Sequence, residues 1–291
     1  MNLRLLKLPT IDFINKRKYA MVFSALLLIV SVISLGLQGL KLGIDFTGGT
    51  LIEVGYQQTA DLEDIRTKLA SANYVGTNVQ HFGSDTEVLI QLESQAISSA
   101  KLSSSIIQML GDGIDVRRVE FVGPKVGEEL TNDGGLALLY ALIGILIYVA
   151  FRFEYRFALG SITALIHDVI ITLGVFSILQ IAFDLTVLAA ILAVIGYSLN
   201  DTIVVFDRIR ENFLSTRHIE PVPIVNDALN QTLARTLMTS LTTLLVLLAL
   251  FYLGGEVIHS FAFAMIVGVI VGTYSSIFVA SPVVIRMGAN N

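Results

Sequence analysis

Hydrophobic residues along this chain are concentrated in long runs with few or no charged side chains, and shorter polar segments separate the runs. The runs cover residues 19–40, 134–151, 157–183, 185–206, 236–255 and 257–285. A helix needs about 20 mostly apolar residues to cross the hydrocarbon core of a bilayer, and each run is close to or above this length. The pattern therefore predicts an α-helical membrane protein with six transmembrane helices.

The first run follows a basic segment, residues 1–18, an order that also occurs in secretory signal peptides. Its 22 uncharged residues, however, exceed the about 7–15 apolar residues of a signal sequence, and no cleavage site of the A-x-A type follows. We therefore interpret residues 19–40 as the first transmembrane helix.

Residues 41–133, between the first and second runs, have the composition of a folded soluble domain. Alternating apolar positions predict strands at 50–56, 78–82, 87–92 and 114–122, and a helical spacing predicts helices at 61–70 and 97–110. A turn at residues 83–85 joins the second and third strands. The order βαββαβ predicts a ferredoxin-like α+β domain.

The distribution of basic residues predicts how the chain is oriented. Residues 1–18, the turn at 152–156, the loop at 207–235 and the tail at 286–291 hold 12 of the 19 Lys and Arg residues. Because basic loops stay in the cytoplasm, we expect both termini in the cytoplasm and residues 41–133 outside, in the periplasm where the cell has an outer membrane. This external domain contains 14 acidic and 7 basic residues, so it should not dock on an anionic membrane.

Composition excludes several kinds of chemistry. The mean hydropathy of +0.74 is that of an integral membrane protein. The net charge of −5 and the lack of a basic stripe interleaved with aromatic residues argue against nucleic-acid binding. The absence of cysteine excludes disulfides, thiolate catalysis and Cys-ligated metals. The four histidines show no metal-ligand spacing, and no Walker-type phosphate loop occurs. We expect no metal, no cofactor and no enzymatic activity.

Asp201 follows Asn200 inside the fourth apolar run. A charged side chain at the centre of a membrane helix costs about 2.5–3.5 kcal/mol on insertion scales, so it suggests a functional site. Asp207 follows six residues later, which places Asp201 in the cytoplasmic third of the span. The hydroxyl groups of Ser198 and Thr202 are close in sequence, and a carboxylate with hydroxyl neighbours suits either H⁺ or Na⁺. The alternative is that Asp201 caps a short helix or lies at the membrane interface.

Two further charged residues lie in or beside apolar runs. Asp168 follows His167 near the middle of the third run, where the pair either relays ions or only forms structural hydrogen bonds to a neighbouring helix. Arg235 precedes the fifth run, and an arginine at the interface needs no functional explanation. If residues 226–227, Asn-Asp, cap a helix, Arg235 instead lies more than two turns inside it, at a depth similar to that of Asp201 and near its charge.

Two segments resemble signatures of the SecD/SecF family of bacterial protein-export membrane proteins, part of the RND superfamily of ion-driven membrane proteins. Residues 42–50, LGIDFTGGT, are similar to the family's Gly-Gly motif, which includes Asp45 and in which Gly48 and Gly49 would form a tight turn into the first strand. The segment from Gly196 to Glu211 is similar to the family's fourth-span motif. The resemblance covers essentially the whole chain.

The resemblance implies one half of a two-half RND unit in the inner membrane. It implies SecD as a partner of similar architecture, the small subunit YajC, and docking on the SecYEG channel. It also implies that a proton or sodium gradient helps to pull an unfolded preprotein across the membrane after the ATP-driven motor has pushed it. Asp201 and Arg235 match the residues tied to ion transport, with Asn200 and Thr202 beside Asp201, and Asp168 is a weaker match. The external domain lacks a large inserted head, so substrate handling would fall mainly to SecD.

Two other functions are compatible with the sequence. Half of an RND-type exporter of small molecules or lipids would need a ligand cavity in a large external region. About 90 external residues with few aromatic side chains offer little lining for such a cavity. A passive assembly factor that holds other subunits together would tolerate the substitution Asp201→Asn without loss of function.

Overall fold

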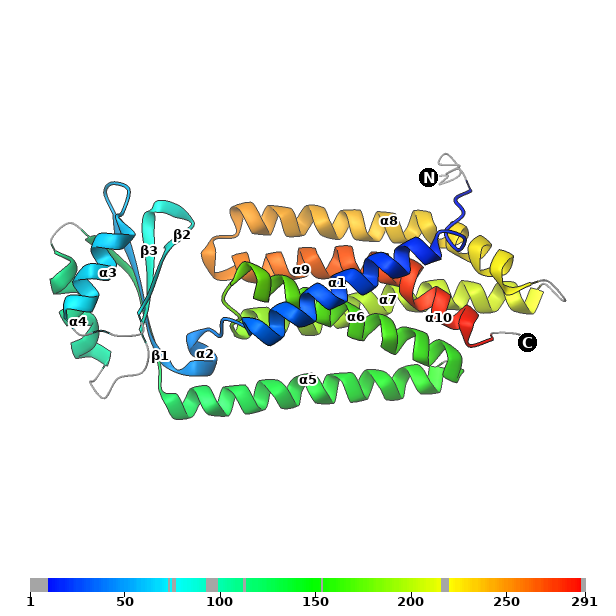
Figure 1. Ribbon diagram of the computed structural model, residues 1–291, viewed down its shortest axis with the longest axis horizontal. Coiled ribbons are helices and arrows are strands. Elements are labelled where there is room, and N and C mark those ends of the chain that lie inside the picture. Colours follow the sequence, from blue (N-terminus) through cyan, green and yellow to red (C-terminus); the bar gives the residue numbers. More distant parts are fainter. Residues whose placement is uncertain are drawn as a thin grey trace. The chain divides into compact units, whose positions relative to one another are not determined.

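A computed structural model describes residues 10–72, 74, 77–92, 99–111, 114–152, 154–215 and 220–288 (Figure 1). The chain forms two compact units. One unit comprises residues 42–137 and 182–185 and includes all four described strands. The other comprises residues 1–41, 138–181 and 186–291, and its described secondary structure is helical.

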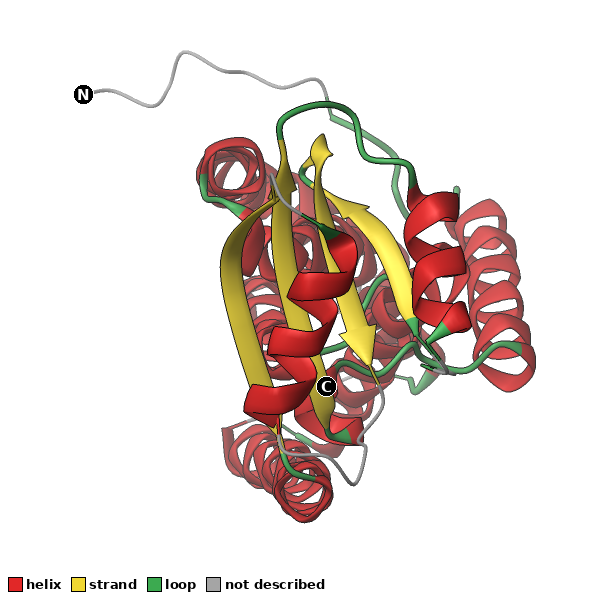
Figure 2. Cartoon of the chain, turned by 90° about the vertical axis from the view of Figure 1, so that its left-hand side faces the viewer, coloured by secondary structure: helices red, strands yellow, loops and turns green. Residues whose placement is uncertain are grey.

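The first unit contains an α+β domain. Its elements in chain order are β1 (Gly49–Tyr56), α3 (Leu62–Ser71), β2 (Asn78–Phe82), β3 (Ser84–Leu92), α4 (Ser99–Leu110) and β4 (Ile114–Val122). The strands form one antiparallel sheet in the order β2-β3-β1-β4, and both helices cover the same face (Figure 2). The predicted ferredoxin-like fold is therefore confirmed.

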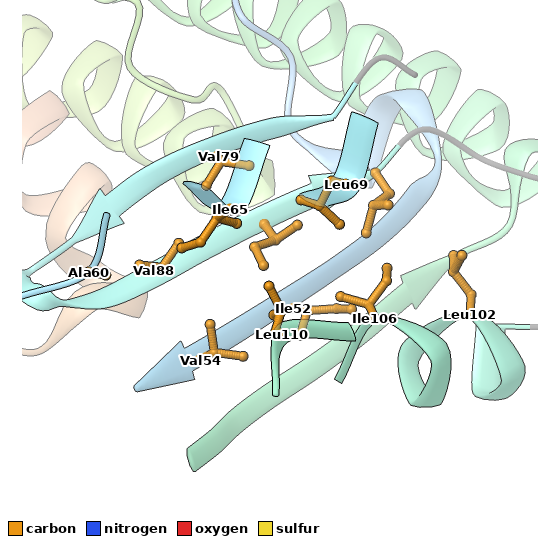
Figure 3. Packing of buried hydrophobic residues seen from close by; sticks show 12 residues of the cluster. Ile52, Val54, Ala60, Ile65, Leu69, Val79, Val88, Leu102, Ile106 and Leu110 are labelled. Atoms are coloured by element: carbon orange, nitrogen blue, oxygen red, sulfur yellow. The ribbon is translucent and has the colours of Figure 1, made fainter. Parts of the chain in front are cut away.

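The core of this domain lies between the sheet and its two helices (Figure 3). Ile52 and Val54 are two residues apart on β1 and so point to the same face, whereas Ile65 and Leu69 are four apart on α3 and share one side of that helix. These two periodicities bring the apolar side chains together. The buried cluster consists of Ile52, Val54, Ala60, Ile65, Leu69, Val79, Val88, Ile90, Leu92, Leu102, Ile106 and Leu110.

Local hydrogen bonds set the ends of these elements. The carboxylate of Asp61 accepts hydrogen bonds from the backbone N–H groups of Glu63 and Asp64, at 2.9 and 3.3 Å, and so caps α3. β3 begins at Ser84, three residues earlier than predicted, because Ser84 already pairs with Phe82. Residues 97 and 98, where the second helix was predicted to begin, lie outside the described residues.

Among the described residues, six helices are long and apolar enough to span a membrane, as predicted. They are α1 (Arg17–Leu37), α5 (Pro124–Arg152), α6 (Tyr155–Leu179), α7 (Leu185–Ser215), α8 (Pro221–Leu253) and the span formed by α9 (Glu256–Ser275) with its continuation. That continuation is a π-helical turn (Ser276–Ala280), followed by α10 (Ser281–Arg286). In the most hydrophobic part of α7, 56% of the residues are buried, against 6% in α5, so α7 is a central helix.

Several helices extend beyond their apolar runs. α5 begins at Pro124, ten residues before the run that predicts it, and most of the expected loop at 207–235 is helical. The expectation that residues 226–227 cap a helix was wrong, because α8 already begins at Pro221, whose missing N–H suits the first helical position. The side-chain oxygen of Asn226 instead accepts a hydrogen bond from Phe13 N at 2.8 Å.

The π-helical turn interrupts the last span just before Pro282. A proline has no N–H to donate to the carbonyl four residues earlier, and π-helical turns inside helices are frequent at functional sites. The hydroxyl of Ser281 donates a hydrogen bond to the carbonyl of Ser276 at 2.9 Å across this turn. The turn starts at Ser276, directly after the last residue of α9, Ser275.

Close packing between α7 and α9 depends on two glycines. A Cβ atom at Gly268 would lie 2.1 Å from Val194, and one at Gly272 would lie 3.0 Å from Ser198. Small residues allow membrane helices to approach in this way. Gly196, in contrast, has open space around it and lies with Asn200 on an exposed side of α7.

Candidate functional site

Asp201 is buried in the middle of the helical unit, with 7% of its surface exposed. Its carboxylate accepts two short hydrogen bonds, one from Thr236 Oγ1 on α8 at 2.6 Å and one from Ser276 Oγ in the π-helical turn at 2.5 Å. Charge-assisted hydrogen bonds of this kind are stronger than bonds between neutral groups. Asp201 therefore connects three separate segments, α7, α8 and the turn after α9.

Asp168 on α6 is even more deeply buried, at 1% exposure. One carboxylate oxygen accepts hydrogen bonds from Ser198 Oγ of α7 at 2.5 Å and Ser275 Oγ of α9 at 2.7 Å. The other oxygen lies 2.9 Å from Nδ1 of His167. Because a buried charge needs such partners, the hydroxyl groups make a carboxylate at this depth tolerable.

Two pairs of neighbouring residues link these carboxylates. Ser275 and Ser276 are consecutive, yet Ser275 binds Asp168 and Ser276 binds Asp201. Ser198 binds Asp168 and lies three residues before Asp201 on α7. The result is one buried polar network that joins α6, α7, α8 and α9.

The His167 side chain, 3% exposed, lies at the side of this network. Its ring stacks on Tyr274, with 6.2 Å between the ring centroids, and its Nε2 atom has no hydrogen-bond partner among the described residues. The hydroxyl of Tyr274 donates to the carbonyl of Ala20 on α1 at 2.8 Å. These contacts connect Asp168 to the first span.

Arg235 lies beside Thr236 on α8, but its side chain is exposed and forms no ion pair within the described part of the chain. The structure thus gives Asp201 hydroxyl partners rather than a salt bridge to Arg235. Asn200 is exposed as well, whereas Thr202 is buried at 1%. Of the residues that the sequence singled out around Asp201, Ser198 and Thr202 share its buried environment, whereas Asn200 and Arg235 do not.

Sequence reasoning missed Thr236, Ser275 and Ser276, the hydroxyl donors from other helices. The available signal was weak, because serine and threonine are common in membrane helices and the network forms only when the helices pack. The adjacent pair of serines in the sixth run was the clearest trace.

The segment that carries the Gly-Gly motif directly precedes and enters the first strand of the α+β domain. It forms a short helix, α2 (Ile44–Thr47), after which Gly48 has φ 70° and Gly49, the first residue of β1, has φ 138°. Both values favour glycine. A Cβ atom at Gly49 would lie 2.3 Å from the carbonyl oxygen of Leu92 on β3, so the close approach of that strand also requires glycine at position 49.

Asp45 in this segment binds the first residue of α7. Its Oδ2 atom accepts a hydrogen bond from the backbone N–H of Leu185 at 3.0 Å, which satisfies a free donor at the start of the helix. The N–H of Gly43 donates to the carbonyl of Phe183 at 2.8 Å, and Phe46 stacks on Phe183. The motif therefore holds the start of the helix that carries Asp201.

No group of three or more His, Cys, Asp or Glu side chains able to hold a metal ion occurs among the described residues. The chemistry available to Asp168 and Asp201 is that of oxygen ligands. Such groups can bind and release a proton or a small hard cation.

Comparisons with known proteins agree with this arrangement. Residues 103–290 match the family "Protein export membrane protein SecD/SecF, C-terminal", and residues 33–60 match "SecD/SecF GG Motif". The protein translocase subunit SecF of Vibrio alginolyticus is 53% identical over 96% of this chain and 90% of the relative. The corresponding subunit of Pseudomonas aeruginosa is 48% identical over 96% of this chain and 92% of the relative.

Solved structures give the same result. The crystal structure of SecDF from Thermus thermophilus, described as a translocon-associated membrane protein, matches with a TM-score of 0.89 and 38% identity over 99% of this chain. SecDF in its super-membrane-facing form matches with a TM-score of 0.72 over 97% of this chain. This chain spans 39% of each of those longer chains. The chain thus belongs to the SecD/SecF family of protein export membrane proteins, among its SecF members.

Proposed function

We propose that this SecF-type subunit of the protein translocase uses a proton or sodium gradient to promote late steps of preprotein translocation. The observation that carries the proposal is the pair of buried carboxylates, Asp168 and Asp201, in one hydroxyl network across four membrane helices. Retaining two carboxylates at this depth is costly, at about 2.5–3.5 kcal/mol each on insertion scales, so a purely structural subunit gains little from them.

The network explains how a bound ion can move helices. A hydrogen bond to a charged group contributes about 1.5–3 kcal/mol and one between neutral groups about 0.5–1.5 kcal/mol. When Asp201 takes up a proton, its bonds to Thr236 and Ser276 weaken, and when it binds sodium the hydroxyl oxygens turn toward the ion. Either event changes how α8 and the π-helical turn hold α7.

The start of α7 provides the link to the α+β domain. Leu185, bound by Asp45, lies 16 residues before Asp201, which corresponds to about 24 Å of helix at ~1.5 Å per residue. A tilt of α7 caused by the ion is therefore transmitted through Asp45 and the Gly-Gly motif to the domain that follows. In this proposal the α+β domain faces the periplasm, both termini are cytoplasmic, and the domain acts on the emerging preprotein.

The proposed partner is SecD, with YajC and the SecYEG channel. Two observations support a second membrane half. Arg235, a charged side chain within a membrane-spanning helix, is exposed, and so are Gly196 and Asn200 on α7. Since an arginine in hydrocarbon is costly, we infer that the partner supplies the groups that face Arg235.

The test is preprotein translocation into membrane vesicles with and without an imposed proton or sodium gradient. Asp201→Asn should abolish the stimulation by the gradient and leave membrane insertion and complex assembly intact. Arg235→Ala should also abolish the stimulation, because it removes the charge that the partner is proposed to face. Asp207→Asn is the matched control, because Asp207 lies on the same helix but binds Arg152 at 2.8 Å near the helix end. Full stimulation in Asp201→Asn vesicles would contradict the proposal for Asp201 and would favour Asp168 or the partner subunit.

A further inference from the structure

A groove in the helical unit is not used by the function proposed above. It has a volume of about 680 Å³ and lies between α1, α6, the π-helical turn and α10. This volume is within the range of about 300–1,000 Å³ typical of ligand pockets. The groove is separate from the network of Asp168 and Asp201, with which it shares only His167.

Most of the groove is apolar. Its walls include Met21, Ala25 and Leu28 of α1 and Ile166 and Ile170 of α6. The polar groups on the walls are mostly engaged within the protein: Ser24 bonds to Tyr274, and Thr163 donates to Leu159 O. His167 Nδ1 bonds to Asp168, and only Nε2 has no partner among the described residues.

The mouth of the groove is basic. Arg17 and Lys18 open α1, Arg286 closes α10, and all three line the groove. No Asp or Glu is among the lining residues, and the three basic side chains form no ion pair within the described part of the chain. The Nη1 atom of Arg17 is buried and has no hydrogen-bond partner among the described residues. Within the described ranges, these three basic side chains therefore face no acidic side chain.

From this geometry we propose that the groove binds an acidic phospholipid of the bilayer, with its phosphate on Arg17, Lys18 and Arg286 and one acyl chain along α1 and α6. The length of the groove suits one acyl chain. From Arg17 to Leu28 the groove follows 11 residues of α1, about 16 Å at ~1.5 Å per residue, which is comparable with half of a hydrocarbon core about 30 Å thick.

The charge of the lining favours an acidic lipid over an apolar helix of another protein, because Arg17, Lys18 and Arg286 are basic and no acidic residue lines the groove. Each Lys or Arg near the surface contributes about 1 kcal/mol to the binding of anionic lipid, which is about a five-fold preference per charge.

The absence of tryptophan from the chain permits a direct test. The full chain is reconstituted in vesicles with a single tryptophan, introduced either by Ile166→Trp in the groove or by Leu245→Trp, an exposed position of α8 outside it. Quenching by brominated phosphatidylglycerol is compared with quenching by brominated phosphatidylcholine of the same acyl chains. We expect phosphatidylglycerol to be preferred at least five-fold at position 166 and not at position 245.

Charge and shape are then changed separately. Arg17→Gln, Lys18→Gln and Arg286→Gln should each lower the preference about five-fold, until none remains. The control Arg210→Gln, an exposed arginine outside the groove, should leave it unchanged. Ala25→Phe should block the groove and lower quenching by both lipids, whereas Val22→Phe, on the exposed side of α1, should not.

Native mass spectrometry of the unsubstituted chain provides a measurement without a reporter. At equal concentrations of the two lipids, phosphatidylglycerol should be retained preferentially, and the triple substitution of the basic residues should remove that preference. Three results would overturn the proposal: equal quenching by both lipids at position 166, weak quenching there by either lipid together with no retained lipid, or a preference that survives the triple substitution. The second result would indicate that a protein segment covers the groove.

Discussion

Ser275 and Ser276 offer a matched pair of substitutions that separates the two carboxylates. Both serines are fully buried, and substitution by alanine removes the same volume at each position. Ser275→Ala removes a hydroxyl donor from Asp168, and Ser276→Ala removes one from Asp201. The two substitutions therefore differ chiefly in which carboxylate loses a hydrogen-bond donor. If Asp201 is the coupling site, Ser276→Ala should alter gradient-driven export much more than Ser275→Ala.

The size of the effect follows from the bond that is lost. A hydrogen bond to a charged group contributes about 1.5–3 kcal/mol, which corresponds to about a 10- to 150-fold change in an equilibrium constant. With proton coupling, Ser276→Ala disfavours the charged carboxylate, so the proton concentration that gives half-maximal stimulation should fall. With sodium coupling, Ser276→Ala removes an oxygen ligand, so the half-maximal sodium concentration should rise.

The assay is preprotein translocation in vesicles that contain the complete complex, measured over a series of imposed proton or sodium gradients. The direction of the shift identifies the coupling ion, and the comparison with Ser275→Ala identifies the carboxylate. A shift in Ser275→Ala with none in Ser276→Ala would transfer the coupling role to Asp168. If neither variant shifts the half-maximal concentration, the hydroxyl network has no part in coupling, and the reasoning from the structure fails.

Three further predictions concern the α+β domain and its link to α7. Gly49→Ala should destabilise the domain by about 1–3 kcal/mol, because residue 49 has a φ of 138° and its Cβ atom would lie against Leu92 O. Gly123 has open space around it, so Gly123→Ala should be almost neutral in the same thermal unfolding measurement. Asp45→Ala should weaken the start of α7 by about 0.5–2 kcal/mol and speed hydrogen exchange at the Leu185 amide by about 2- to 30-fold. The exposed Asp85→Ala is its control, and unchanged exchange in Asp45→Ala would contradict the capping role. Burial raises the pKa of the Tyr56 phenol above its ordinary value of 10.0, and the charge of Asp64 adds to this shift. The folded state holds the phenol proton more tightly than the unfolded state does. The contribution of Tyr56 to stability is therefore complete below pH 10.0 and is lost as the pH rises through the folded pKa. Tyr56→Phe should reduce this loss of stability when unfolding is measured at pH 9 and at pH 11. An identical alkaline loss in both proteins would exclude Tyr56 as its source.

The sequence alone determined the number of spans and the fold of the α+β domain. Apolar runs of about 20 residues have few stable structures other than membrane helices. In the α+β domain, the two-residue spacing of Ile52 and Val54 indicates a strand, and the four-residue spacing of Ile65 and Leu69 indicates a helix. It also identified Asp201 and Asp168, because a carboxylate inside an apolar run is conspicuous through its energetic cost alone.

Only the tertiary structure decided what these carboxylates contact. α9 is apolar on all sides, so its sequence contains no periodicity to show which face meets α6 or α7, and the positions of Ser275 and Ser276 look like any small residues in a membrane helix. Their hydroxyls reach two different carboxylates because four helices pack together around them. The same packing buries Thr236 and leaves its neighbour Arg235 exposed. Which of the two faces the protein interior depends on how α8 is rotated against the other helices, and the local sequence does not contain that information.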